Sequence, residues 1–159
     1  MSVRQAQPRD FPAVYLMGYD RWNEGLNQAA YLDACSTSTR YRAGTWWVLT
    51  DANDRPRASL IVYDLYSGKF GLASIATEPS LRGQGLAKRL IQSVCRSLTD
   101  PRAVFLFSEV GTALYERCGF APFPDIHQHV PGQICMIWTP DSRAVEFVSQ
   151  PGFQPPALF

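Results

Sequence analysis

The spacing of apolar positions changes along the chain, and each spacing predicts a different kind of element. Apolar residues three or four positions apart predict a first helix, which Asp10 can cap and which ends near Trp22, and a second helix over residues 27–35. Three aromatic and β-branched runs, separated by turn-forming residues, then predict strands. These runs lie at residues 45–50, 58–63 and 70–77. Their short separations favour an antiparallel meander.

Beyond residue 77 the pattern changes between helix and strand. An amphipathic helix over 84–98 is predicted by the apolar residues on one face, which are Leu86, Leu90, Ile91, Val94 and Leu98. The runs that follow predict, in order, a buried strand, a helix and two more strands, at 103–107, 111–118, 126–130 and 133–138. A meander that leads into strand–helix–strand–helix predicts an α/β fold with a partly parallel sheet.

Composition narrows the functional classes. The chain has 159 residues, of which 46% are apolar and 18% charged, as is typical of one globular domain. Its 15 basic and 14 acidic side chains nearly cancel, so we expect no nucleic-acid partner. No apolar run reaches the roughly 18 residues that a membrane span needs, and residues 1–10 lack the apolar stretch of a signal peptide. We therefore expect a cytoplasmic protein without a membrane partner.

Cysteine and histidine add little chemistry. The four cysteines are widely spaced and only two histidines are present, so the clustered ligand set of a metal site is missing. We expect no metal, and we interpret the cysteines as buried free thiols. Without repeats or a low-complexity linker, residues 1–140 are expected to form one domain, and residues 141–159 an extended, proline-containing C-terminal tail.

The segment from residue 74 to residue 88 carries the clearest chemistry. A predicted strand ends near Thr77, and Gly83 and Gly85 then introduce the predicted helix. Glycine lets the backbone turn tightly and approach a ligand closely. The free N–H groups and the positive dipole end of a helix start favour a phosphate, and Arg82 adds a permanent cation. These features predict a pyrophosphate-binding turn.

Gly-x-Gly before a helix is equally compatible with a flexible strand-to-helix turn. The segment lacks the Gly-Lys-Ser/Thr ending of a nucleotide-binding P-loop and the third glycine of a dinucleotide fingerprint. Both nucleotide interpretations are weaker for that reason, although the first stays open as a third hypothesis.

Two segments resemble the GNAT (GCN5-related N-acetyltransferase) superfamily. Residues 82–87, Arg-Gly-Gln-Gly-Leu-Ala, resemble its acyl-CoA signature, Arg/Gln-x-x-Gly-x-Gly/Ala. Residues 113–120, Ala-Leu-Tyr-Glu-Arg-Cys-Gly-Phe, resemble its Leu-Tyr-x-x-x-Gly-Phe helix ending. With the flanking strands, the resemblance extends over about residues 45–138. It implies a single-domain, mostly antiparallel mixed sheet flanked by helices, in which two parallel strands, here 72–77 and 103–107, splay apart around a cofactor.

The resemblance also implies an activity and the residues that serve it. The expected reaction is direct transfer of an acetyl group from acetyl-CoA to a primary amine. The backbone at the turn would hold the CoA pyrophosphate, through Arg82, Gly83, Gln84, Gly85, Leu86, Ala87 and Lys88. The preceding strand end would pair with the pantetheine arm and help to polarise the acetyl carbonyl, through Ile75, Ala76 and Thr77. Ser108 stands where the family often has an asparagine that contacts the cofactor, and its reach is shorter.

Two side chains are candidates for proton transfer. Tyr115 matches the family tyrosine that can protonate the departing thiolate, although a packed core tyrosine is the competing interpretation. Glu109 follows the strand at 103–107, where the slot is expected to open, and is our candidate base, with water as the alternative. A noncatalytic acyl-CoA-binding or regulatory module remains the alternative function, because Ser108 replaces the asparagine and no base is obvious.

In the family, the N-terminal helices usually shape the acceptor site. Here this region is rich in aromatic side chains and also contains a few acids. The aromatic residues are Tyr15, Tyr19, Trp22, Tyr31, Tyr41, Trp46 and Trp47, and the acids are Asp20, Glu24 and Asp33. An aromatic pocket with a few acids suits a cationic amine, although Trp47 is better explained as core. The acceptor is expected to be a small amine or a protein amino group, and a homodimer is left open.

Overall fold

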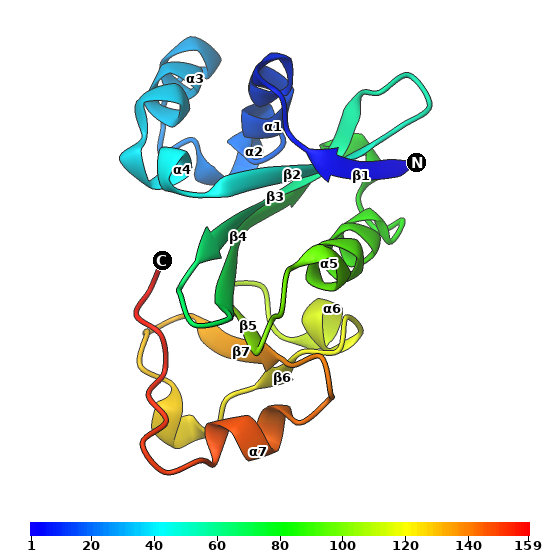
Figure 1. The fold of residues 1–159 in the computed structure, drawn as a ribbon. Coiled ribbons are helices and arrows are strands. Elements are labelled where there is room, and N and C mark those ends of the chain that lie inside the picture. The colour runs from blue at the N-terminus through cyan, green and yellow to red at the C-terminus, as the bar shows by residue number, and fades with distance from the viewer.

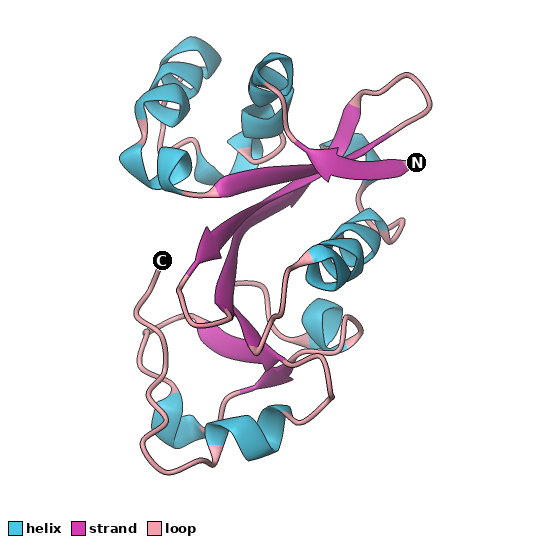
Figure 2. Cartoon of the chain, viewed as in Figure 1, coloured by secondary structure: helices cyan, strands magenta, loops and turns pink.

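Seven strands form one mixed sheet with helices on both faces (Figures 1 and 2). The computed structural model describes residues 1–159. The strands are β1 (Ser2–Gln5), β2 (Thr45–Thr50), β3 (Pro56–Asp64), β4 (Lys69–Thr77), β5 (Ala103–Ser108), β6 (Ala121–Pro122) and β7 (Ile134–Trp138). Their order in the sheet is β1-β2-β3-β4-β5-β7-β6, and only β4 and β5 run parallel. The predicted α/β fold, mostly antiparallel with one parallel pair, is confirmed.

Ten short helical segments connect or cover the strands. The α-helices are α1 (Phe11–Leu16), α2 (Tyr19–Trp22), α3 (Gln28–Thr37), α4 (Thr39–Ala43), α5 (Leu86–Ser97), α6 (Ala113–Glu116) and α7 (Ala144–Val148). The 3-10 turns are η1 (Pro8–Asp10), η2 (Pro79–Leu81) and η3 (Asp125–His127). The group from α1 to α4 lies on one face of the sheet, and α5 and α6 lie on the other (Figure 1). None of these helices has the length and apolar character of a membrane span.

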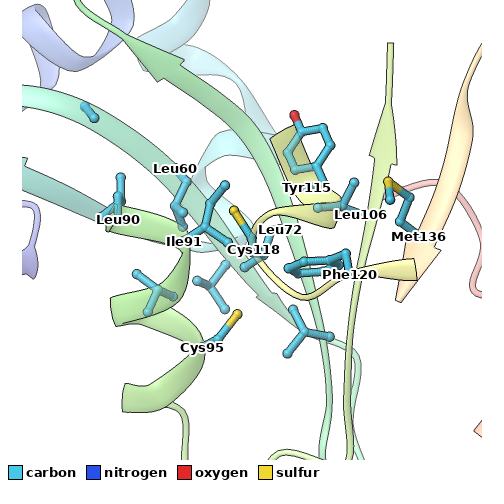
Figure 3. Packing of buried hydrophobic residues seen from close by; sticks show 14 of the residues in the cluster. Leu60, Leu72, Leu90, Ile91, Cys95, Leu106, Tyr115, Cys118, Phe120 and Met136 are labelled. Carbon is cyan, nitrogen blue, oxygen red and sulfur yellow. The ribbon is translucent and has the colours of Figure 1, made fainter. Parts of the chain in front are cut away.

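The main core lies between the sheet and the α5–α6 face. Helix α5 buries Leu90, Ile91 and Val94 completely, as its apolar spacing predicted. These side chains belong to one cluster with residues of the central strands and with Tyr115 of α6 (Figure 3). Because alternate strand residues face opposite sides, Trp46 belongs to the smaller cluster under α1, whereas Trp47 packs against the main core.

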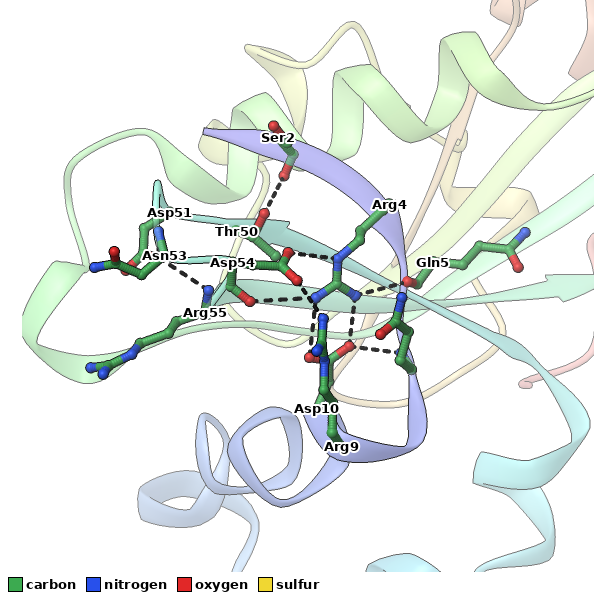
Figure 4. A network of polar contacts seen from close by, with 11 residues as sticks. Ser2, Arg4, Gln5, Arg9, Asp10, Thr50, Asp51, Asn53, Asp54 and Arg55 are labelled. Carbon is green, nitrogen blue, oxygen red and sulfur yellow. Dashed lines mark hydrogen bonds and ion pairs between the residues drawn. The ribbon is translucent and has the colours of Figure 1, made fainter.

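The N-terminal region differs from the expectation in two ways. The helix expected to run to Trp22 is interrupted at Gly18, where a Cβ atom would lie 2.0 Å from the Trp22 ring. Strand β1 was not predicted, because its four residues are polar or half-buried and carry little pattern. Arg4 anchors β1 by donating to the Asp10 carboxylate at 2.7 Å and to the Asp54 carboxylate at 2.9 Å (Figure 4).

The region before β7 was predicted wrongly. Residues 126–130 were expected to form a strand, but they contain the end of η3 and an irregular loop, and β7 pairs instead with β6. The Gln128 side chain explains the difference, because it donates to the carbonyls of Phe123 and Cys135 and accepts from the Cys135 N–H. These bonds satisfy backbone groups that a neighbouring strand would otherwise pair.

The C-terminal segment packs against the sheet. It contains α7, whose Ala144 and Val148 are buried, and it returns along the lower part of the sheet to end beside β4 (Figure 1). The Phe159 ring lies on Gly71, where a Cβ atom would come within 2.5 Å, and 5.3 Å from the Phe107 ring centroid. Apolar contacts of this kind across distant segments leave no local pattern in the sequence.

Candidate active site

The two parallel strands stop pairing partway along their length. The β4–β5 ladder ends at the pair Leu72 and Leu106, although β4 continues to Thr77. Ser74 adopts a left-handed backbone conformation, with φ 48°, where β4 bulges against β3. The far half of β4, including Ile75, Ala76 and Thr77, therefore has no strand on its β5 side. Its backbone groups there are available to an extended ligand, as at a sheet edge.

The glycine turn follows this strand end directly. Gly83 and Gly85 have φ angles of 79° and 80°, a region that favours glycine, and no atom lies within 4 Å of a Cβ built at either position. Gly85 caps the 12-residue helix α5 without a side-chain cap. The first N–H groups of α5, including those of Leu86, Ala87 and Lys88, lack partners within the helix. An open space beside free N–H groups and a positive dipole end suits a phosphate group.

The side chain of Arg82 is directed away from this space. Its guanidinium donates to both carboxylate oxygens of Asp20, at 2.7 and 2.8 Å, and to the carbonyls of Met17 and Thr77, at 3.1 and 3.3 Å. The pairing lowers the pKa of Asp20 and links α2 to the glycine turn. Arg82 was expected to supply a cation to the phosphate, and Asp20 to supply an acid to the acceptor. Because 62 residues separate Asp20 from Arg82 in the chain, no local sequence pattern indicates that they pair.

Tyr115 and Ser108 lie together on the other side of the strand opening. Tyr115 is buried and its hydroxyl points away from the main cluster (Figure 3). Burial raises the pKa of this hydroxyl, and the nearby Ser108 side chain partly opposes the shift. The Ser108 hydroxyl also donates to the Gly111 carbonyl and accepts from the Val110 N–H at 3.2 Å. Both bonds hold the Ser108 side chain against the backbone of the turn at Val110 and Gly111.

Glu109 and Gln84 have exposed side chains. Glu109 follows β5 and accepts a hydrogen bond from the Gln133 side chain at 3.0 Å. Its charge adds to the raised pKa of Tyr115, after the effects of burial and of Cys118, so the carboxylate lies on the Tyr115 side of the opening. Gln84 is exposed at the glycine turn.

On the opposite face of the sheet, Tyr41 reaches the bulge of β4. Burial raises the pKa of its hydroxyl, and the nearby Ser74 side chain partly opposes that shift. The Tyr41 ring stacks on Tyr15 at 5.8 Å and meets Trp46 edge-on at 5.1 Å. Aromatic side chains of the N-terminal helices therefore extend to the point where β4 and β5 separate.

Comparisons with known proteins give a consistent result. The model of the acetyltransferase (GNAT) family matches residues 2–120. No curated protein sequence matches the chain significantly. A chimera of the Vibrio cholerae spermidine N-acetyltransferase SpeG and hSSAT superimposes with a TM-score of 0.68 at 15% identity, covering 92% of this chain and 99% of that one. The GNAT family N-acetyltransferase YhbS from Escherichia coli, solved with CoA, superimposes with a TM-score of 0.63 at 21% identity, covering 87% and 80%.

At such identities the solved structures establish a shared fold. The family model spans most of the chain, from β1 through the glycine turn to the end of the segment that follows α6. Both segments on which the sequence resemblance was based lie within it. The chain belongs to the acetyltransferase (GNAT) family.

Proposed function

We propose that this protein binds acetyl-CoA in the opening between β4 and β5 and transfers the acetyl group directly to a primary amine. The observation that carries the proposal is the glycine turn at Gly83 and Gly85, with open space beside it and the free N–H groups of α5 facing that space. The strand opening that leads away from the turn is the second support.

The residues of the turn fit the acyl-CoA pyrophosphate. The N–H groups from Gly83 to Lys88 would donate to the phosphate oxygens, while the Leu86 side chain stays in the core. Arg82 would act through its backbone and by holding the turn against α2, since its guanidinium is already paired. The pantetheine arm would lie along the free side of β4, beside Ile75, Ala76 and Thr77.

Acetyl-CoA supplies a thioester: the amine nitrogen forms a bond to the acetyl carbon, the carbon–sulfur bond breaks, and the sulfur leaves as a thiolate that takes up a proton. Tyr115 is our candidate for the donor of that proton. Its raised pKa keeps the hydroxyl protonated at neutral pH, so it carries the proton that the thiolate needs. Glu109, directly or through water, would accept the proton that the attacking amine loses.

The proposal extends to the compartment. All four cysteines are free and buried, in agreement with a reducing environment such as the cytoplasm. The amine is proposed to be a small molecule by analogy with the structurally similar spermidine N-acetyltransferase. A noncatalytic acyl-CoA-binding module is the second candidate, motivated by Ser108 and its commitment to the Val110–Gly111 turn.

Two assays test the proposal. Calorimetry should show that acetyl-CoA and CoA bind and that ATP binds far more weakly, because ATP has no pantetheine arm to pair with β4. Thiol release should then appear when acetyl-CoA is mixed with a panel of primary amines, with the N-acetylated amine identified by mass spectrometry. Acetyl-CoA binding without thiol release for any amine would support the noncatalytic module. Tight ATP binding without CoA binding would contradict both candidates.

A further inference from the structure

A large cavity lies among the N-terminal helices, away from the glycine turn. It has a volume of about 840 Å³, is open to solvent, and is lined by the end of β1, the start of α1, helices α3 and α4, and the start of β2. Four aromatic side chains form much of its wall, namely Phe11, Tyr15, Tyr41 and Trp46. A cavity of this size accommodates a drug-sized molecule, and a one- or two-carbon amine would leave most of it empty.

The aromatic wall is fixed by contacts within the protein. Tyr15 stacks on Phe11 at 5.6 Å and on Tyr41 at 5.8 Å, and it meets Trp46 edge-on at 5.9 Å. The Trp46 indole N–H donates to the Tyr41 carbonyl at 3.2 Å. Rings held in this way need little reordering when a ligand binds, so the apolar surface of a ligand contributes more of its transfer free energy to affinity.

Tyr41 connects the cavity with the candidate active site. Its ring lines the cavity, and it packs on the same apolar cluster as Ala73 of β4, next to Ser74 at the bulge. The acetyl carbonyl is proposed to lie beside that part of β4. Tyr41 is therefore the cavity residue that leads toward this part of β4.

The polar groups of the cavity select weakly for charge. One carboxylate, from Asp33, and one guanidinium, from Arg42, line it, and both residues are exposed. Arg42 also donates to the Ser36 carbonyl through two of its nitrogens, at 3.1 and 2.8 Å. Because the two charges offset each other, the aromatic wall decides which ligand fits best.

We propose that this cavity binds the apolar body of the acceptor, and that the acceptor is a primary amine carrying an aromatic or similarly bulky apolar group. The body lies among the four rings, and the amino end extends past the Tyr41 hydroxyl toward Ser74. This inference rests on the proposed acetyl transfer for the identity of the ligand as acceptor, but the binding of an aromatic amine in the cavity can be measured without turnover.

Ser36→Trp fills the cavity from α3, and Thr37→Trp is its matched control. Both residues are exposed near the end of α3, and both hydroxyls donate to the Asp33 carbonyl, at 2.9 and 3.0 Å. Only Ser36 lines the cavity. Each substitution loses a hydrogen bond to the Asp33 carbonyl, and Thr37→Trp also loses one to the Ala34 carbonyl at 3.4 Å. Both add the same indole, but only the indole at position 36 occupies the proposed binding space.

The test uses 2-phenylethylamine and ethylamine, which differ by the phenyl ring. For the wild type and Thr37→Trp, kcat/KM for 2-phenylethylamine should exceed that for ethylamine by about 100-fold or more, because one buried ring contributes that much by area. Ser36→Trp should reduce this ratio by at least about tenfold and weaken calorimetric binding of 2-phenylethylamine to a similar extent, since the indole takes the space of the ring. Acetyl-CoA affinity should be the same in all three proteins.

The outcomes separate the two claims. If neither amine releases thiol, the acetyl transfer proposal fails for this class, and the calorimetry alone decides whether the cavity binds the aromatic amine. If Ser36→Trp binds or acetylates 2-phenylethylamine as well as Thr37→Trp does, the cavity is not the site of the apolar body. Equal use of the two amines by the wild type would also overturn the inference.

Discussion

Gly85→Ala tests the phosphate-binding role of the glycine turn, because its effects on stability and on ligand binding can be separated. Gly85 has φ 80°, and a Cβ atom at this position would meet no protein atom within 4 Å. The substitution therefore causes backbone strain and no steric clash in the free protein. A left-handed conformation costs an L-residue roughly 1–2 kcal/mol, part of which is offset by the lower entropy of the unfolded chain. We expect a loss of about 1 kcal/mol in the free energy of unfolding.

Gly132→Ala provides the control for strain. Gly132 is exposed like Gly85, has φ 76°, and also has no protein atom within 4 Å of a built Cβ, but it lies in the turn before β7. Urea denaturation should give similar losses for the two variants. Calorimetry with CoA should separate them, because only the Cβ at Gly85 enters the space beside the first N–H groups of α5.

The expected change in CoA affinity follows from that difference. Gly85→Ala should raise the CoA Kd by about tenfold or more, equivalent to losing one good hydrogen bond to a charged group, whereas Gly132→Ala should leave it within about twofold. Equal CoA affinity in the two variants would refute the idea that the phosphate binds at this turn. If both variants lost CoA affinity, the cause would be general destabilisation of the protein.

Three further predictions concern other parts of the molecule. Tyr115→Phe should lower kcat by about 100-fold while acetyl-CoA affinity stays within about twofold, and an unchanged kcat would exclude Tyr115 as the acid. Asp20→Asn should lower the unfolding free energy by less than about 1 kcal/mol, because the pair with Arg82 is partly exposed. It should also raise the KM for acetyl-CoA, and an unchanged KM would show that the pair does not hold the turn. Burial raises the pKa of Cys95 and Cys135 to about 12, so both thiols should resist a thiol reagent at pH 8 in the native protein. Their contribution to the free energy of unfolding should be fully present below pH 9 and should be lost as the pH rises toward 12.

The elements predicted best are those whose own residues carry the pattern. Helix α5 has an apolar face that repeats every turn, and β2 and β5 are runs of aromatic and β-branched residues, so tertiary contacts only reinforce a local preference. The glycine turn was predictable for the same reason, because its left-handed backbone conformation favours glycine at positions 83 and 85.

What the sequence did not show depends on contacts between distant segments. The salt bridge between Arg82 and Asp20 redirects a cation that local reasoning assigned to the phosphate. The bonds of Gln128 replace an expected strand with a loop, and the Phe159 ring rests on Gly71 from the far end of the chain. In each case the partner is chosen by the three-dimensional fold, so no spacing within the sequence indicates it.

The most direct test of the central claim is a crystal structure of the protein with acetyl-CoA bound. The account predicts that the pyrophosphate accepts hydrogen bonds from the N–H groups between Gly83 and Lys88, and that the acetyl group lies between the Ser74 bulge and the Tyr115 hydroxyl. A pyrophosphate bound elsewhere on the chain, or an acetyl group outside the opening between β4 and β5, would contradict it.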